Sequence, residues 1–215
     1  MKNSFFMSIE GPDGAGKTTL INLLLPHLEE KLGDDLVSTR EPGGVRISEK
    51  IRDLVLGVEY PEMDGRTEAL LFAAARSQHL VEVILPALKE NKFVLSDRFV
   101  DSSIAYQGAG RELGVKEVAD INKFATRNIE PDFTIYLDIP SEIGIQRIMA
   151  NRTDEVNRLD KDALNFHIKV RSAYLKLAED NPTRIFTLDA TKTPEVLTQE
   201  ALELINKQLE KGDYL

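Results

Sequence analysis

A glycine-rich stretch near the N-terminus has the residue types and the spacing of a phosphate-binding loop. It matches the pattern G-x-x-x-x-G-K-[ST] and comprises Gly11, Pro12, Asp13, Gly14, Ala15, Gly16, Lys17 and Thr18, with Thr19 directly after it. Glycines let such a loop turn its backbone N–H groups towards a phosphate, and a helix that begins at Lys17 adds the positive end of its dipole. Lys17 would reach the β- and γ-phosphates, while the Thr18 hydroxyl would bind Mg²⁺. A chance match in a chain of this length has a probability of only about 0.01, so the motif predicts a nucleoside-triphosphate site.

Three classes of protein use such a loop: GTPase switches, ATP-driven motors and small-molecule kinases. A GTPase would carry Asn-Lys-x-Asp to read guanine, but residues 122–125 read NKFA and lack the aspartate. A motor would usually have a strand that ends in carboxylates for water activation, whereas here Asp97 is followed at once by Arg98. Asp97 could hold Mg²⁺ through water, and Arg98 could grip a second anionic group. These neighbouring features favour a kinase whose acceptor is itself a phosphate.

The composition excludes several other kinds of site. The 215 residues include no cysteine, which rules out disulfides, thiolate zinc sites and cysteine nucleophiles. The histidines, His27, His79 and His167, form no i,i+4 pair that would indicate a metal site. With 27 Lys and Arg against 36 Asp and Glu, the net charge of −9 disfavours nucleic acid as a partner. The longest apolar run, 69–75, is far shorter than the roughly 20 residues that span a membrane, and 1–4 do not begin a signal peptide, so we expect a cytoplasmic protein.

Strand-like and helix-like segments alternate along the chain. Short apolar runs, typical of strands buried on both faces, cover 5–10, 36–40, 93–97, 133–138 and 185–189. Helical patterns cover 17–32, 48–57, 66–90, 115–128, 141–150, 159–179 and 194–211. This alternation predicts an α/β fold, a doubly wound five-stranded parallel sheet with helices on both faces. With no linker or repeat, we expect one domain over 1–215. Ligands bind at the carboxyl ends of such strands, where the chain has Glu10, Arg40, Asp97 and Asp138.

Four segments together resemble the thymidylate kinase family of P-loop nucleoside-monophosphate kinases. They are residues 10–19 (EGPDGAGKTT), 39–44 (TREPGG), 64–76 (DGRTEALLFAAAR) and 97–108 (DRFVDSSIAYQG). The first marks only a large superfamily, whereas the second and the fourth are much more specific. The resemblance implies a homodimeric cytosolic enzyme of dTTP synthesis that converts ATP and dTMP to ADP and dTDP with Mg²⁺. The alternatives are another nucleotide or nucleoside kinase on the same scaffold, or a nucleotide-switch binding protein.

The helix predicted at 66–90 carries a candidate base site. Its periodicity gives a core stripe comprising Leu70, Ala74, Val81, Leu85 and Leu88. Phe72 and Arg76 are i,i+4 neighbours on the opposite side, away from the core. An aromatic ring beside a guanidinium suits a flat base with carbonyl oxygens, so Phe72 would stack on thymine and Arg76 would donate to its O4. The alternative is a second packing face, since Leu80 and Val83 lie on the same side, and this face could extend into a dimer interface.

The resemblance also implies roles around the acceptor nucleotide. Ser103 and Gln107 would hold the base edge, and Tyr106 would sit against the sugar and disfavour a 2′-hydroxyl. Asp13 would lie near the 3′-hydroxyl. Arg52 and Arg98 would grip the acceptor phosphate, although Arg52, with Glu49 and Asp53 nearby, could be only a surface ion pair. Glu41 and Pro42 would form a turn that shapes the pocket, and the sequence does not decide whether their peptide bond is cis.

The expected chemistry needs charge neutralisation more than it needs a base. The second pKa of a phosphate monoester is about 6, so the attacking oxygen is already anionic at pH 7. Lys17, Mg²⁺ and arginines should therefore align and neutralise the phosphates, with Asp97 positioning metal and water. Some family members carry an arginine in the phosphate loop, where this chain has Gly14. We expect a short lid at about 147–160 to provide it instead. Within this lid, Arg152 or Arg158 would be the catalytic arginine, and Arg147 would pack near adenine.

Overall fold

The computed structural model describes residues 4–151 and 164–211, and it contains the predicted parallel sheet. The strands are β1 (Phe5–Glu10), β2 (Leu36–Arg40), β3 (Phe93–Asp97), β4 (Phe133–Asp138) and β5 (Ile185–Asp189), in the spatial order β2-β3-β1-β4-β5. All neighbouring strands are parallel. These bounds match the predicted ones because apolar runs buried on both faces, such as that of β1, are read reliably from the sequence.

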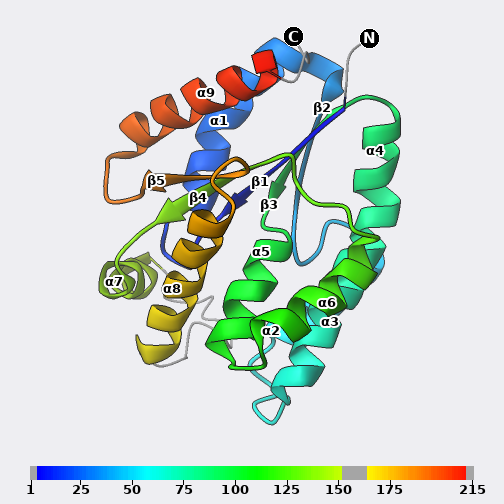
Figure 1. The fold of residues 1–215 in the computed structure, drawn as a ribbon, viewed down its shortest axis with the longest axis vertical. Helices are drawn as coiled ribbons and strands as arrows, with labels where there is room; N and C mark the ends of the chain where they lie inside the picture. The colour runs from blue at the N-terminus through cyan, green and yellow to red at the C-terminus, as the bar shows by residue number, and fades with distance from the viewer. Residues whose placement is uncertain (1–3, 152–163, 212–215) are drawn as a thin grey trace.

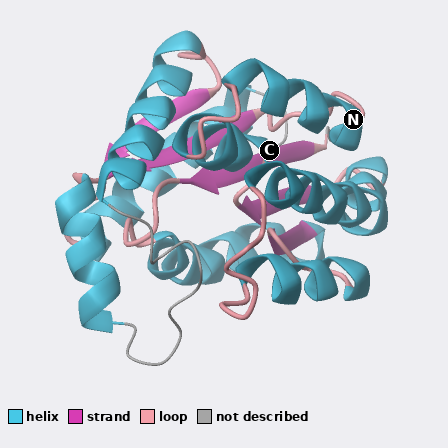
Figure 2. Cartoon of the chain, turned by 90° about the horizontal axis from the view of Figure 1, so that it is seen from below, coloured by secondary structure: helices cyan, strands magenta, loops and turns pink. Residues whose placement is uncertain are grey.

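Helices cover both faces of the sheet (Figures 1 and 2). They are α1 (Lys17–Leu32), α2 (Arg46–Leu56), α3 (Gly65–His79), α4 (Leu85–Lys89), α5 (Val100–Ser103), α6 (Val115–Thr126), α7 (Ser141–Asn151), α8 (Leu164–Asp180) and α9 (Pro194–Lys211). One apolar core joins α1 and α9 to one face of the sheet. On the other face, Phe6 and Val94 pack against residues near α4, and Tyr136 packs against α8. The described helices include none that is long and apolar enough to cross a membrane.

The prediction of a single helix at 66–90 is wrong in two respects. The observed segment consists of α3, a π-helical turn (Leu80–Ile84) and α4, where Pro86 has no N–H to donate to the preceding turn. The expected core stripe is also misplaced, since Leu70 is 56% exposed and Ala74 is exposed. The side carrying Phe72 and Arg76 is the buried one, because α3 packs against both α2 and α6.

Other helix boundaries differ more modestly. α2 begins two residues before the expected start, and α6 ends at Thr126 because Arg127 and Asn128 adopt the left-handed conformation. The expected motif segment after β3 contains α5 and a π-helical turn (Ile104–Gly110) that the sequence pattern did not predict. Single π turns often occur at functional sites, and this one carries Tyr106 and Gln107.

The strand ends bring the predicted motifs together at one edge of the sheet. Beyond β2, the Glu41 N–H donates to the Asp97 carbonyl at 2.9 Å, and beyond β3 the Arg98 N–H donates to the Ile9 carbonyl at 3.0 Å. The backbone pairing thus continues for one residue past each strand. The phosphate loop, the 39–44 segment and the 97–108 segment therefore begin side by side, as the topology rule for such sheets requires.

Candidate active site

The phosphate loop closes around the Lys17 side chain. Lys17 Nζ donates to the carbonyls of Gly11 at 3.0 Å and Pro12 at 3.1 Å, and it lies 4.0 Å from Asp13 Oδ1. Burial is the main cause that lowers the pKa of Lys17 to about 8, and the nearby charge of Arg98 adds to it. A buried cation of this kind gains most when an anion approaches it, which suits a phosphate-binding lysine.

The loop is pressed against helix α7 at Gly14. Gly14 has φ 78°, and a Cβ there would lie 2.2 Å from the Gly144 carbonyl oxygen. Only glycine combines this backbone conformation with such a close approach. The loop therefore has no room for an arginine at Gly14, in agreement with the expectation that any such group comes from elsewhere in the chain.

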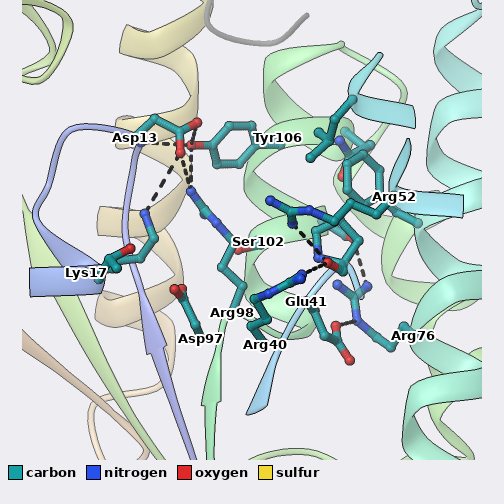
Figure 3. Close-up of a pocket in the computed structure, with 16 residues that line it drawn as sticks. Asp13, Lys17, Arg40, Glu41, Arg52, Arg76, Asp97, Arg98, Ser102 and Tyr106 are labelled. Atoms are coloured by element: carbon teal, nitrogen blue, oxygen red, sulfur yellow. Dashed lines mark hydrogen bonds and ion pairs between the residues drawn. The ribbon is translucent and has the colours of Figure 1, made fainter. Parts of the chain in front are cut away.

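Arg98 connects the loop to the acceptor side of the site (Figure 3). Its guanidinium donates to Asp13 Oδ1 at 2.7 Å, to the Gly11 carbonyl at 3.0 Å and to Ser102 Oγ at 3.0 Å. Tyr106 also donates to Asp13 Oδ2 at 2.8 Å, so Asp13 lies between the two side chains. Burial alone would lower the pKa of Arg98, but the neighbouring Tyr106 and Asp13 raise it well above its ordinary value. Arg98 has φ 70°, a left-handed conformation that is uncommon outside glycine and is often associated with functional sites.

Glu10, the last residue of β1, fixes the segment that carries Arg98. Its carboxylate accepts from the Phe99 N–H at 2.6 Å, from Ser102 Oγ at 2.6 Å and from the Tyr174 hydroxyl at 2.9 Å. Burial, followed by repulsion from Asp101, raises the pKa of Glu10 to about 7. Glu10 is therefore a supporting residue of the site, which the sequence located at a strand end without giving it a role.

This raised pKa predicts a pH-dependent stability. The folded protein binds the Glu10 proton more tightly than the unfolded chain, in which the pKa is close to 4.5, so the Glu10 contribution to the free energy of unfolding falls as pH rises from about 4.5 to 7. Glutamine does not titrate, so Glu10→Gln should remove this loss. Its free energy of unfolding relative to the wild type should be about 2 kcal/mol higher at pH 8 than at pH 5. Urea unfolding of both proteins at pH 5 and pH 8 measures this, and the same stability difference between them at both pH values would contradict the prediction.

A cavity beside Arg98 is lined by every residue that was predicted for the acceptor nucleotide. These residues are Asp13, Glu41, Pro42, Arg52, Phe72, Arg76, Arg98, Ser103, Tyr106 and Gln107. Arg40, Leu56, Asp97 and Ser102 line it as well. Cationic side chains and the Phe72 ring thus share one concave site, which is the arrangement that a nucleotide with an aromatic base and a phosphate requires.

Two arginines of this cavity, Arg40 and Arg52, meet at the Pro42 carbonyl. Arg40 and Arg52 each donate to it at 2.9 Å, and Arg40 also forms a two-point contact with Glu49. Arg52 therefore lines the cavity and contacts its wall, while its predicted grip on a phosphate stays a prediction. Burial and then the nearby Arg40 lower the pKa of Arg52, as expected where cations converge. The Glu41–Pro42 peptide bond is cis.

The residues predicted for the base are more firmly held than the sequence indicated. Arg76 donates through Nε to Glu41 Oε2 at 2.7 Å, and through its Nη atoms to Ser103, Asn122 and the Phe99 carbonyl. Gln107 Nε2 donates to Glu68 Oε1 at 2.8 Å. Phe72 and Arg76 thus lie on a packed face and also line the cavity, so the two interpretations of this face are compatible. Because this face is buried within the chain, it is not an available dimer interface.

A second cavity lies on the other side of the phosphate loop. It is lined by residues 13–20 together with Arg147, Ile148, Ala190, Lys192, Pro194 and Leu197. Asp13, Lys17 and Thr18 line both cavities, so the two spaces meet at the lysine and the threonine of the motif. Of the residues predicted for ATP, Gly11 and Pro12 do not line this cavity, since their carbonyls face Lys17. Two cavities joined at a phosphate loop suit transfer of a phosphoryl group between two nucleotides.

Comparison with known families agrees with this geometry. A family model described as thymidylate kinase matches residues 9–201. The chain belongs to the thymidylate kinase family. A thymidylate kinase of Oenococcus oeni is 64% identical over 97% of this chain and 98% of its own length. One from Pediococcus pentosaceus is 55% identical over 96% of this chain and 99% of its own length. The crystal structure of thymidylate kinase from Ehrlichia chaffeensis matches with a TM-score of 0.76 and 31% identity, covering 94% of this chain and 99% of that one, which confirms the predicted fold class.

Some residues that line the two cavities were not found from the sequence. The loop after β5 contributes Ala190 and Lys192 to the second cavity, the start of α9 contributes Pro194, and Arg147 donates to the Ala190 carbonyl at 3.0 Å. The only signal for this loop was its place at the carboxyl end of a strand. Asn122 was considered only as part of a guanine motif. The predicted catalytic residues Arg152 and Arg158, like most of the predicted lid, lie outside the described residues.

The Mg²⁺ ion that the thymidylate kinase family implies has suitable ligands here. Within the described residues, Asp97 Oδ1 is buried and has no hydrogen-bond partner. Asp97 lines the acceptor cavity, and Thr18 lines both cavities. The described ranges contain no group of three or more His, Cys, Asp or Glu side chains that could hold a metal. Because Mg²⁺ is commonly bound by one or two protein oxygens with phosphate and water, Thr18 and Asp97 fit such an ion.

Proposed function

We propose that this chain transfers the γ-phosphoryl group of ATP to dTMP and so produces dTDP for dTTP biosynthesis. Membership of the thymidylate kinase family supports this activity. The observation that carries it is the pair of cavities that meet at Lys17 and Thr18, one lined by arginines and Phe72 and the other by the phosphate loop and Arg147. ATP would occupy the second cavity and dTMP the first.

The geometry of Arg76 supports recognition of thymine. A guanidinium has five N–H hydrogens, and contacts among the described residues occupy four of those of Arg76. The fifth, on Nη2, remains for a ligand in the cavity. Arginine only donates hydrogen bonds, so Arg76 would donate to the C4 carbonyl of thymine and disfavour the C4 amino group of cytosine. Phe72 would stack on the base beside it.

The phosphoryl transfer itself would depend on alignment and charge. The acceptor phosphate would lie near Arg52 and Arg98, and its attacking oxygen needs no base because it is already anionic. Lys17 would hold the transferring group of ATP, while Asp13 would orient the sugar hydroxyl. Mg²⁺, held by Thr18 and Asp97, would supply further neutralisation of the phosphates when bound. The proposed lid, 147–160, would add Arg152 or Arg158 at the transferring phosphoryl.

A substrate panel tests this proposal. ADP release with ATP should be fastest with dTMP when it is compared with dUMP, dCMP, dGMP, AMP, GMP and thymidine. Discrimination against dCMP should be the strongest among pyrimidine nucleotides, because its amino group would face the Arg76 donor. Preference for thymidine over dTMP would show that the acceptor is not a phosphate. ATP turnover that needs no acceptor would favour a nucleotide switch or a motor.

The chain is also proposed to act as a homodimer. Helices α2 and α3 pack on one another, α6 packs on α3, and they carry the exposed side chains Leu54, Leu70 and Phe124. Phe124 is 90% exposed and Leu70 is 56% exposed, so these packed helices present large apolar side chains at the surface. A second copy of the chain would cover them.

The dimer proposal predicts the effect of a charge among the exposed side chains Leu54, Leu70 and Phe124. Replacing Leu70 by glutamate should shift the mass in solution from dimer to monomer, because a buried unpaired carboxylate is costly. Light scattering coupled to size-exclusion chromatography measures the mass. Replacing Val196, an exposed residue of α9, by glutamate is the matched control and should leave the dimer intact. A wild-type protein that is monomeric at micromolar concentration would contradict the proposal.

The remaining proposals concern organisation and location. The single sheet that unites residues from β1 to β5 supports one domain. A cytoplasmic enzyme without nucleic-acid or membrane partners agrees with small nucleotide substrates and with the net charge of −9. The site gathers basic residues within an acidic chain, so the negative total restricts the size of the anion that binds and does not exclude it.

A further inference from the structure

His79 lies at the end of α3 and is completely buried. Its Nδ1 is 2.9 Å from Glu41 Oε1, and its Nε2 is 2.6 Å from Thr39 Oγ1. With the proton on Nδ1, the ring donates to Glu41 and accepts from the Thr39 hydroxyl, so both nitrogens are satisfied. Gly44 covers the ring closely, since a Cβ at Gly44 would lie 2.9 Å from His79 Cδ2. The ring is therefore held in one orientation.

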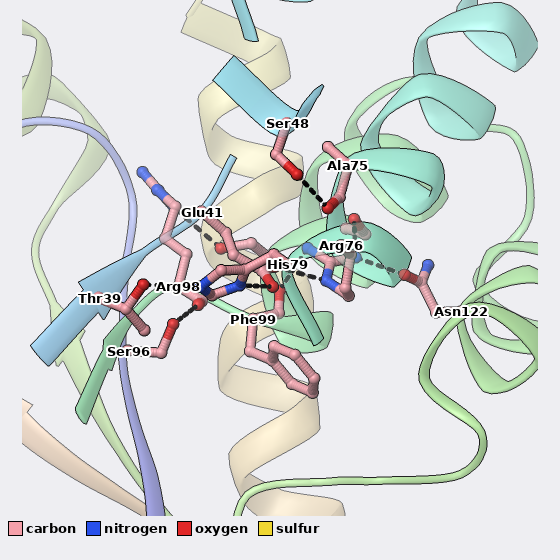
Figure 4. A network of polar contacts seen from close by, with 12 residues as sticks. Thr39, Glu41, Ser48, Ala75, Arg76, His79, Ser96, Arg98, Phe99 and Asn122 are labelled. Carbon is pink, nitrogen blue, oxygen red and sulfur yellow. Dashed lines mark hydrogen bonds and ion pairs between the residues drawn. The ribbon is translucent and has the colours of Figure 1, made fainter. Parts of the chain in front are cut away.

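The Glu41 carboxylate joins His79 to Arg76 (Figure 4). Its Oε1 contacts His79, and its Oε2 accepts from Arg76 Nε at 2.7 Å. Arg76 and His79 are three residues apart on one face of α3, which lets both reach the same carboxylate. Glu41 is only 5% exposed. A carboxylate buried to this degree needs a partner at each oxygen, so the removal of either one would disturb the other contact.

The position of Glu41 matters for both ends of the acceptor cavity. It accepts from Arg76 Nε at 2.7 Å and so helps to fix the plane of a guanidinium that lines the cavity. Glu41 is also bonded directly to Pro42, and the Pro42 carbonyl accepts hydrogen bonds from Arg40 and Arg52 at 2.9 Å each. His79 itself is not among the residues that line either cavity. Its influence on a ligand must therefore be indirect.

We propose that His79 is a positioning residue for acceptor recognition, which fixes Glu41 and through it aims Arg76 at the C4 carbonyl of the base. This inference rests on the proposed function and deepens it. Thr39, His79, Glu41 and Arg76 act as one hydrogen-bonded series from the end of β2 to the base site. The hydrogen bonds of such a series strengthen one another, so the loss of one member weakens the contacts of the others.

The test compares three replacements of His79. Asparagine places an amide N–H close to the position of Nδ1, glutamine places one close to Nε2, and leucine offers no donor. The leucine variant should raise KM for dTMP about tenfold, as for a lost hydrogen bond to a charged group, with KM for ATP and kcat changed less than about twofold. The asparagine variant should recover most of the dTMP affinity, and the glutamine variant should not.

A double-mutant cycle with Glu41→Gln separates positioning from simple packing. If His79 acts through Glu41, the double variant Glu41→Gln/His79→Leu should bind dTMP no worse than Glu41→Gln alone. Additive effects, equal losses for dTMP and ATP, or rescue by glutamine in place of asparagine would overturn the inference. If the leucine variant does not fold, as thermal melting would show, the asparagine–glutamine comparison decides. A wild-type enzyme that does not phosphorylate dTMP would instead contradict the proposed function.

Discussion

Replacing Arg98 by alanine is expected to lower kcat/KM for dTMP by about 10³-fold, the range seen when a phosphate-binding arginine is lost. Arg98 lines the acceptor cavity and donates to the Gly11 carbonyl and to Asp13, so it is the cation that lies between the phosphate loop and the acceptor. A lysine at this position should recover little of the activity, because its single ammonium cannot reproduce the fork of contacts that the guanidinium makes. Steady-state kinetics with varied dTMP at saturating ATP measures both variants.

The backbone conformation of Arg98 calls for a matched control. Arg127 is also an arginine with positive φ, 56°, but it is exposed at the end of α6 and lines neither cavity. Arg127→Ala should leave kcat/KM within twofold of the wild type, since both substitutions keep a Cβ and leave the backbone strain unchanged. A loss below tenfold in Arg98→Ala would mean that other cations of the cavity carry the acceptor phosphate.

Replacing Lys17 by methionine is expected to lower kcat by about 10³-fold while leaving the folded protein as stable as the wild type or more so. The catalytic loss follows from removing the cation at the junction of the two cavities. The stability follows from the lowered pKa of Lys17, about 8, because burial disfavours the charged form in the folded state only. Methionine has a similar length and carries no charge that must be desolvated.

Kinetics and thermal melting at pH 7 measure these opposite effects together. Lys31 provides the matched control, since it lies on the same helix and donates to Asn206 Oδ1 at 2.7 Å on the exposed surface. Lys31→Met should change neither kcat nor the melting temperature appreciably. A Lys17→Met variant that keeps kcat within threefold, or that melts well below the wild type, would contradict the assignment of Lys17 as a strained, functional cation.

Much of this molecule is determined locally along the chain. The strand bounds were predicted correctly, most clearly for β1, β3 and β4, whose buried residues need a sheet that is covered on both faces. The phosphate loop was equally clear, since its glycines and Lys17 are fixed by backbone conformation and charge within eight residues. The family motifs also identified residues that gather in one cavity, from Asp13 to Gln107. Their individual roles remain predictions.

The tertiary structure decided which face of α3 is buried and what holds the side chains of the predicted base site. Periodicity cannot choose between two apolar faces of a helix that packs on α2 and on α6, so Leu70 was expected inside and Arg76 outside, and both were wrong. The partners of Arg76 come from Glu41, 35 residues before it, and Asn122, 46 residues after it. Such contacts depend on how the strands and helices pack in space, and side chains that are distant in sequence meet only once the fold has formed.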